Sequence, residues 1–146
     1  MFSGVSKKIT LSNVQEIEAK LSIKLPEQLV KHYLRFNGGV PEKTFFYSEI
    51  SDIETNVKLF VPLQYVNEEY TSCTLEDTYL DFIQRGIIPV KYLPFAYDWG
   101  GNVFCVDLKL GYVVIIWMDI GEVTENSIKL LANDFREFLD NLGDED

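Results

Sequence analysis

The stretch PFAYDWGGNVFCVDL, residues 94–108, places a turn-prone cluster between an apolar run and an alternating, strand-like segment. Gly100 and Gly101 suit a chain reversal, because glycine adopts backbone angles that other residues avoid. Asp98 and Asn102 flank the glycines, and such side chains commonly bond to the backbone of a turn. The stretch therefore predicts a turn, tied by these two side chains, that leads into a β-strand.

Two aromatic residues, Tyr97 and Trp99, stand beside this turn. If both rings fold back onto the core, the turn is only a chain reversal. A tryptophan that stays exposed beside two glycines would instead be a good anchor for a partner, because a rigid ring supplies contact area at little entropic cost. The residues alone leave both interpretations open, and any function at this turn is expected to be contact.

Strand patterns extend on both sides of the turn. The segment YVVIIWM, residues 112–118, is apolar on both faces, which is typical of a central strand with helices over at least one face of the sheet. Gly111 suits a positive φ in the hairpin before it. Earlier in the chain, aromatic and β-branched residues predict strands at 44–50 and 57–63, with a polar linker between them. Pro62 favours a sheet edge or a strand end for the second.

Four amphipathic segments predict helices. Ser12 and Gln15 match a capping box at the start of the first helix. Asn37, Gly38 and Gly39 predict a left-handed stop at the end of the second. The predicted ranges are about 13–21, 26–36, 75–85 and 133–142. Two helices, a run of strands with one inserted helix, and a last helix together predict an α+β fold in a single domain, 1–146.

Composition and charge narrow the class of partner. Of the 146 residues, 47% are hydrophobic and 14% aromatic, which suffices for the core of one domain. Thirteen Lys and Arg against 23 Asp and Glu give a net charge of -10, which argues against nucleic acid or an anionic membrane as partner and favours a basic protein. Neither a signal-peptide pattern nor a run of about 18 apolar residues occurs, so we expect a cytoplasmic location.

The sequence predicts no metal and no cofactor. Cys73 and Cys105 lack the CxxC spacing of zinc sites. The Gly-Gly-Asn turn has no phosphate-binding pattern around it and leads into a strand, so it lacks a helix dipole. Several carboxylates lack the spacing of an EF-hand loop; they are Asp52, Glu54, Glu68, Glu69, Glu76 and Asp77.

Catalysis is not predicted either. The single histidine, His32, falls opposite the apolar stripe of its helix and is predicted to be exposed, which argues against a Ser-His-Asp or Cys-His arrangement. Asp98, Asp107 and Asp119 could act as acid–base groups, but each lies at a turn or strand end, where aspartate commonly bonds to the backbone. We therefore expect a protein that is not an enzyme.

An acidic, aromatic-rich segment is the strongest sign of a binding surface. Between Glu42 and Asp81, nine acidic residues face only Lys43 and Lys58. Aromatic residues are interleaved with them, among them Tyr47, Phe60, Tyr65, Tyr70 and Tyr79. Such a surface could imitate nucleic acid toward a basic protein, since charge speeds encounter and buried aromatics slow release. The alternative is that the carboxylates are solvated loop and helix faces. The candidate partner-binding residues are Glu54, Glu68, Glu69, Tyr70, Glu76, Tyr97, Asp98 and Trp99.

Two longer motifs stand in order along the chain. Residues 17–39, IEAKLSIKLPEQLVKHYLRFNGG, and 93–119, LPFAYDWGGNVFCVDLKLGYVVIIWMD, resemble the two signatures of the SUKH superfamily. The closing LANDFREFLDNL also resembles the last helix of that family. The resemblance covers about residues 11–142 and implies a twisted, mainly antiparallel sheet flanked by about four helices, with 143–146 as a frayed acidic tail.

The resemblance also implies a function. Single-domain bacterial members of the family are typically immunity proteins, which bind and neutralise a polymorphic toxin, frequently a nuclease. We therefore expect a monomer or weak homodimer that inhibits a basic protein toxin stoichiometrically. A scaffold domain that binds a cellular protein, as in the fungal cell-wall regulators of the family, is the alternative, ahead of a carboxylate-dependent hydrolase. Trp99 departs from the family pattern, since many members carry a small or polar residue before Gly-Gly.

Overall fold

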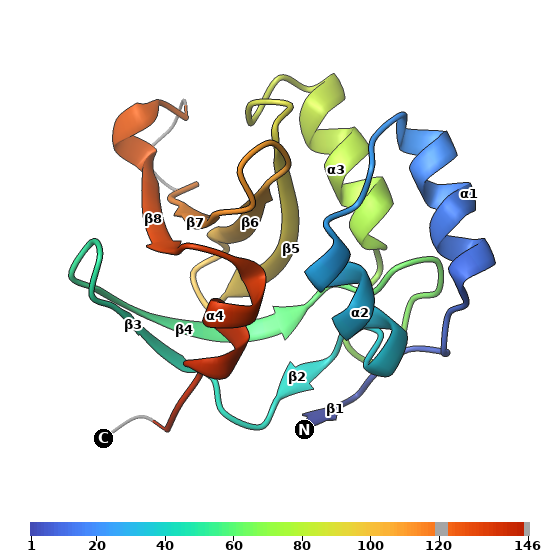
Figure 1. Ribbon diagram of the computed structural model, residues 1–146, viewed down its shortest axis with the longest axis horizontal. Coiled ribbons are helices and arrows are strands. Elements are labelled where there is room, and N and C mark those ends of the chain that lie inside the picture. The colour runs from blue at the N-terminus through green and yellow to red at the C-terminus, as the bar shows by residue number, and fades with distance from the viewer. Residues whose placement is uncertain (119–122, 145–146) are drawn as a thin grey trace.

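The computed structural model describes residues 1–118 and 123–144, and its centre is a six-stranded antiparallel sheet (Figure 1). Each strand pairs with the next along the chain, in the order β3-β4-β5-β6-β7-β8. This meander confirms the predicted α+β class with a mainly antiparallel sheet. The strands are β3 (Phe45–Ser48), β4 (Ile53–Phe60), β5 (Tyr92–Asp98), β6 (Val103–Asp107), β7 (Val113–Ile116) and β8 (Ile128–Ala132).

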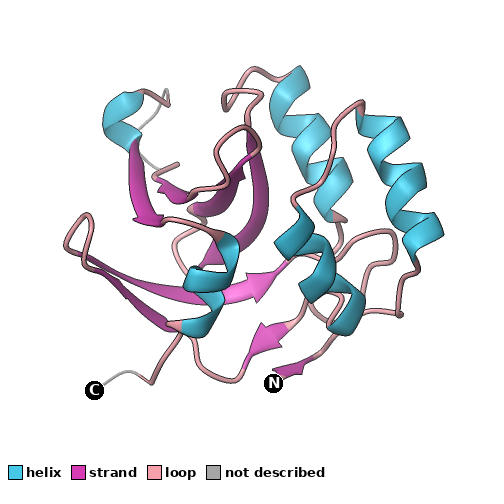
Figure 2. Cartoon of the chain, in the orientation of Figure 1, coloured by secondary structure: helices cyan, strands magenta, loops and turns pink. Residues whose placement is uncertain are grey.

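The helices that precede β5 gather on one side of the molecule, whereas the last helix lies over the main sheet (Figure 2). The helices α1 and α3 contact each other, and so do α2 and α4. None of the helices in the described parts of the chain is long and apolar enough to cross a membrane. The elements outside the main sheet are α1 (Leu11–Leu21), α2 (Glu27–Arg35), α3 (Leu75–Gln84), α4 (Phe135–Asp140), the 3₁₀-helix Glu125–Ser127, and the short strand pair β1 (Phe2–Ser3) and β2 (Val40–Pro41).

The sheet curls until its first and last strands approach each other. Ser48 Oγ, in β3, donates to the Leu131 carbonyl of β8 at 2.9 Å, and Ser51 Oγ donates to the Leu130 carbonyl. These hydroxyls satisfy carbonyls on the outer edge of β8, which would otherwise be open to another strand. The sheet is therefore nearly closed, and its concave face encloses most of the core.

Aromatic rings fill that concave face. Phe138 of α4 lies with its ring centroid 4.8 Å from Phe46, 5.6 Å from Phe104 and 5.7 Å from Phe95. Along β6, Phe104 belongs to this core while Cys105 belongs to a second apolar cluster on the opposite face of the sheet. Both faces of β7 are likewise buried, and the strand lies between β6 and β8, so the prediction of a central strand is confirmed.

The Asn-Gly-Gly motif joins three segments and does not cap a helix in the predicted way. The helix α2 ends at Arg35, and Phe36 is already extended. Asn37 is buried, donates through Nδ2 to the carbonyls of Lys7 (2.9 Å) and Leu63 (2.8 Å), and accepts through Oδ1 from the Leu63 amide at 2.7 Å.

The glycines that follow Asn37 allow a close approach of backbones. Gly38 and Gly39 have positive φ values of 75° and 99°. A Cβ on Gly39 would lie 2.4 Å from the Ser3 carbonyl oxygen, so only glycine fits there. Gly39 also exchanges two backbone hydrogen bonds with Phe60 at the end of β4.

Several predicted boundaries were wrong. The helix α1 is capped by Thr10 and Asn13, in place of Ser12 and Gln15, because Thr10 Oγ1 accepts from the Asn13 amide and Asn13 Oδ1 accepts from the Thr10 amide. The strand β4 begins at Ile53, within the linker predicted to be polar and irregular. The strand β8 and the pair β1–β2 were not predicted. The strand β8 pairs with β7, and Phe2–Ser3 pairs with the remote segment Val40–Pro41. These pairings form only in the folded chain, so the local sequence pattern does not show them.

The segment after α4 is also more ordered than predicted. Gly143 exchanges backbone hydrogen bonds with Phe45 at 2.7 and 3.0 Å, which ties the start of the supposed frayed tail to β3. The prediction for the last two residues lies outside the described residues.

His32 was wrongly predicted to be exposed. Its ring packs against Phe2, Phe60 and Phe135 at centroid distances of 4.7, 5.7 and 5.7 Å. Its Nε2 is buried without a hydrogen-bond partner in the part of the chain that the structure describes. The cause is β1, whose Phe2 folds over a helix face that the sequence periodicity leaves open. Burial, followed by the charges of Arg35 and the amino terminus, lowers the pKa of His32 from 6.5 to about 4.

This buried imidazole predicts acid sensitivity. The unfolded chain binds a proton at His32 below about pH 6.5 and the folded chain only near pH 4, so the free energy of unfolding should fall as pH drops between those values. The full shift corresponds to a loss of up to about 3 kcal/mol. Denaturant unfolding from pH 7.5 to pH 4 checks this, with His32→Gln as the control. Other titrating groups, including Glu76 with its raised pKa, act equally in both proteins. Parallel stability curves for the two proteins would contradict the assignment.

Candidate functional site

The turn between β5 and β6 is held by its own side chains. Asp98 Oδ1 accepts hydrogen bonds from the amides of Gly100 and Asn102, both at 2.9 Å, and Asn102 Nδ2 donates to Asp98 Oδ2 at 3.0 Å. Gly101 has a φ of 85°. The predicted tie between Asp98 and Asn102 is confirmed. Asn102 also accepts from the Met118 amide at 2.8 Å, which fixes the turn to the segment after β7.

The two aromatic residues of the turn, Tyr97 and Trp99, differ in exposure to solvent. Tyr97 is half-buried and packs against both apolar clusters, and burial raises its pKa. Trp99 is 74% exposed, and one face of its indole ring lies 5.2 Å from Lys58 Nζ. The core interpretation therefore holds for Tyr97, whereas Trp99 has the exposure that an anchor for a partner requires.

Two surface hollows meet at Trp99 and share Asp98, Trp99 and Gly100 in their walls. The first has a volume of about 300 Å³ and is also lined by Glu54, Asn56 and Trp117. The second has a volume of about 580 Å³ and is also lined by Lys58, Tyr70 and Tyr97. We call the surface formed by the two hollows and the ring between them the Trp99 face.

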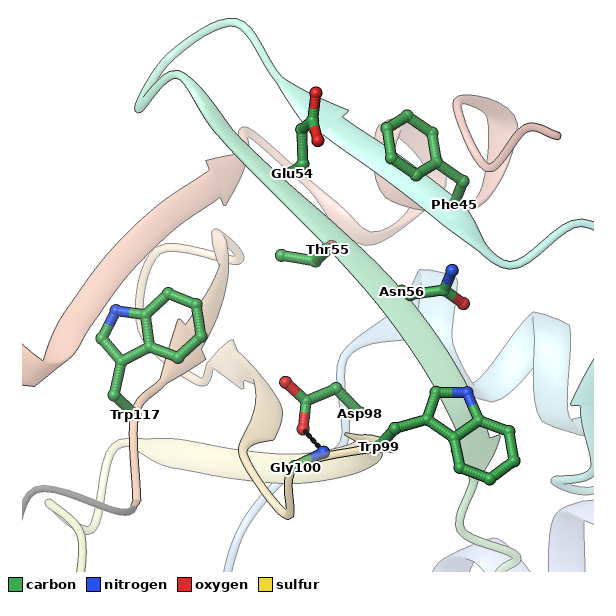
Figure 3. Close-up of a pocket in the computed structure, with 8 residues that line it drawn as sticks. All are labelled: Phe45, Glu54, Thr55, Asn56, Asp98, Trp99, Gly100 and Trp117. Atoms are coloured by element: carbon green, nitrogen blue, oxygen red, sulfur yellow. Dashed lines mark hydrogen bonds between the residues drawn. The ribbon is translucent and has the colours of Figure 1, made fainter. Parts of the chain in front are cut away.

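The first hollow exists because two paired strands differ in length. The strand β5 ends at Asp98, opposite Val57 of β4. The part of β4 that precedes Val57 continues past that point and is paired on the β3 side. Figure 3 shows the resulting hollow, with Trp99 and Trp117 on opposite sides and Asp98 and Gly100 below the passing strand.

The predicted acidic residues are divided between surface and core. Glu54 is exposed and lines the first hollow. Glu68 and Glu69 are exposed on the loop before Tyr70 but line neither hollow. Glu76 is only 4% exposed, and its carboxylate accepts from the Gln64 amide at 2.9 Å. Because it is buried and already bonded to the backbone, Glu76 does not belong to the candidate surface.

The aromatic residues of the acidic segment divide in the same way. Phe60 and Tyr79 are core residues, whereas Tyr47 and Tyr70 are 44% and 46% exposed. The ring of Tyr70 lies against Gly4, where an added Cβ would come within 2.6 Å of it. Tyr70 therefore lines the Trp99 face with its ring packed against the backbone at Gly4.

The three aspartates considered for acid–base chemistry do not form a described cluster. Asp98 ends β5, whereas Asp107 ends β6 and pairs with Tyr92 at the other end of β5. Asp119 lies outside the described residues. Asp107 is buried, accepts from the amides of Lys109 and Leu110 at 2.8 and 3.0 Å, and lies 3.8 Å from Lys91 Nζ. It holds the next hairpin, in which Gly111 has the predicted positive φ, 81°.

Metal-ligating side chains are likewise not gathered in the described residues. Among residues 1–118 and 123–144, no three His, Cys, Asp or Glu side chains lie where they could hold one ion. Cys73 is exposed and Cys105 is buried, which raises the pKa of the Cys105 thiol well above its usual range. The residues around Trp99 can bind a protein surface through ring and charge contacts. The aspartate among them, Asp98, accepts hydrogen bonds from the backbone of the turn.

Among the residues of the Trp99 face that the sequence did not point to are Asn56, Lys58 and Trp117. For Trp117 a signal was present, because it follows Val113 and Ile115 on the concave face and so continues that row past the strand end. Asn56 and Lys58 gave no such signal. Their place beside Trp99 depends on how β4 passes the turn of β5.

A family model covers most of the chain. The model of the SMI1 / KNR4 family (SUKH-1) matches residues 8–141 of the chain. No curated protein matches the sequence. The family match spans both motifs, the whole main sheet and the whole of α4.

Proposed function

The chain belongs to the SMI1/KNR4 family (SUKH-1), and from that premise we propose that it is an immunity protein that binds a protein toxin and neutralises it without turnover. The observation that carries the proposal is Trp99, a large ring that is 74% exposed on a turn fixed by three side-chain hydrogen bonds. Large aromatic residues held rigidly at a surface are the usual centres of protein interfaces. The proposed complex needs no cofactor and forms in the cytoplasm.

The chemistry of the first hollow favours a basic partner. Its charged lining residues are Glu54 and Asp98, and the Asp98 oxygens are already used by the turn. Glu54 is exposed and has no cation within 4 Å among the described residues. A lysine or arginine of the partner could therefore reach Glu54 between the two indole rings. Lys58 shows that a cation can lie over the Trp99 ring, because its Nζ is 5.2 Å from the ring centroid.

The direct test is capture of a toxin. The purified protein is offered to the carboxyl-terminal domains of candidate toxins, and pairs that bind are co-expressed to measure rescue of growth. Binding with rescue supports the proposal. If the protein binds none of the candidate toxins but captures a cellular protein, the alternative of a regulatory scaffold domain would be favoured. Turnover of a substrate by the isolated chain would overturn both.

Charge should govern how fast the complex forms. With a net charge of -10 and a basic partner, we expect the association rate to fall about tenfold or more when ionic strength rises from about 0.05 M to about 0.5 M. Stopped-flow mixing with the cognate toxin measures this rate. Glu54→Gln should lower the rate at low salt and flatten its salt dependence. An association rate that does not change with salt would remove charge steering from the proposal.

A further inference from the structure

A second surface has the opposite electrical character. The helices α2 and α4 lie side by side, and the Arg136 amide donates to Gln28 Oε1 at 3.0 Å across them (Figure 1). Between them runs a groove of about 440 Å³. It shares no lining residue with the Trp99 face, so its role is argued separately from the proposed function.

The groove concentrates positive charge on an acidic protein. Its lining residues include three basic side chains, those of Lys31, Arg35 and Arg136, against the carboxylates of Glu27 and Asp140. Three other hollows on the protein, the two at Trp99 and one beside Glu76, are each lined by at least as many carboxylates as cations. In a chain with a net charge of -10, this local reversal marks a place where a negatively charged group can approach.

Two of these cations are not neutralised within the described residues. Lys31 and Arg35 lie one helical turn apart on α2 and are exposed, and neither has a carboxylate within 4 Å in the described parts of the chain. Like charges at this spacing destabilise a helix slightly. Arg136, across the groove, forms an ion pair with Asp140 of its own helix at 3.6 Å, and with no other carboxylate among the described residues.

The shape of the groove favours an extended peptide. Side chains one helical turn apart are separated by about 5–6 Å at Cβ. Carboxylates two residues apart in an extended segment are separated by about 7 Å, so one can meet Lys31 and the other Arg35. Leu139, which is half-buried on the α4 side of the groove, offers an apolar contact to a side chain of the peptide that lies between the two carboxylates. A long polyanion such as nucleic acid would extend beyond the groove onto the acidic remainder of the surface and be repelled.

We propose that the α2–α4 groove binds a short, extended acidic segment of another protein, with its carboxylates on Lys31, Arg35 and Arg136. The probe is a short labelled peptide in which glutamate alternates with alanine around one central leucine, and fluorescence anisotropy at low ionic strength measures binding to the full chain. We expect saturable binding that the double substitution Lys31→Glu/Arg35→Glu weakens about tenfold or more.

The matched control is Lys8→Glu/Lys24→Glu, which changes the net charge equally at two exposed lysines outside the groove. It should weaken binding far less, and Trp99→Ala should not weaken it, so failure here is distinct from failure of the proposed function. Thermal unfolding confirms that each variant is folded. No binding by the unaltered chain, or equal loss in both double variants, overturns the proposal. Displacement by equimolar inorganic phosphate, or tighter binding of a single-stranded oligonucleotide, reassigns the groove and also overturns it.

Discussion

Replacing Trp99 by alanine should weaken binding of the cognate toxin by about hundredfold while leaving the fold intact. The ring is 74% exposed in the free protein, so its removal should change the free energy of unfolding by less than about 0.5 kcal/mol. In a complex, the same ring would be buried between two hollows, and truncation of such a central aromatic residue costs about 2–4 kcal/mol of binding energy. Calorimetric titration of toxin with each variant measures the effect.

A matched control comes from the next hairpin. Leu110 is 65% exposed at the opposite end of β6, outside the Trp99 face, so Leu110→Ala removes a similar exposed apolar group without touching the candidate interface. Its dissociation constant should match that of the unaltered protein. If Trp99→Ala binds toxin as tightly as Leu110→Ala does, the Trp99 face is not the interface, and the proposed site is wrong even if toxin binding itself is real.

Asn37→Asp should destabilise the protein by about 3–5 kcal/mol at neutral pH. The amide Nδ2 donates to the carbonyls of Lys7 and Leu63 inside the protein, and an aspartate would place a charged oxygen against both of them. Unpaired buried charge has a cost of this order. Protonation of the new carboxyl group restores one donor, so the loss should shrink as the pH falls. Urea unfolding at pH 7 and pH 5 measures both effects.

The comparison for this substitution is an equally isosteric change at the surface. Asn141 is exposed after α4 and donates to the Glu137 carbonyl at 2.7 Å. Asn141→Asp introduces the same charge in contact with water, and we expect a loss of less than about 1 kcal/mol. Similar losses for the two variants would mean that Asn37 does not hold the three segments together.

Much of the turn chemistry was predictable because it is local. Asp98 and Asn102 lie four residues apart, and their hydrogen bonds close a ring that the sequence itself brings within reach. The cap of α3 is similarly local, since Thr74 Oγ1 accepts from the Asp77 amide. Such contacts depend on neighbours along the chain, which any reading of the sequence includes.

Exposure was harder to predict, and the candidate site depends on it. Glu76 was expected on the surface, but the Gln64 backbone lies against its carboxylate and the side chain is buried. His32 was expected in water, but Phe2 covers it. Trp99 was left open, and only the lengths of β4 and β5 show that its ring stands between two hollows.

By itself the sequence determined the α+β class, most of the elements and the turn at Asp98, because apolar periodicity and turn chemistry act over a few residues. Tertiary structure decided which polar and aromatic side chains face water, because segments far apart in the chain supply the atoms that cover them. The same cause separates the acidic Trp99 face from the basic α2–α4 groove. Their residues come from distant elements, and only the folded chain assembles each surface.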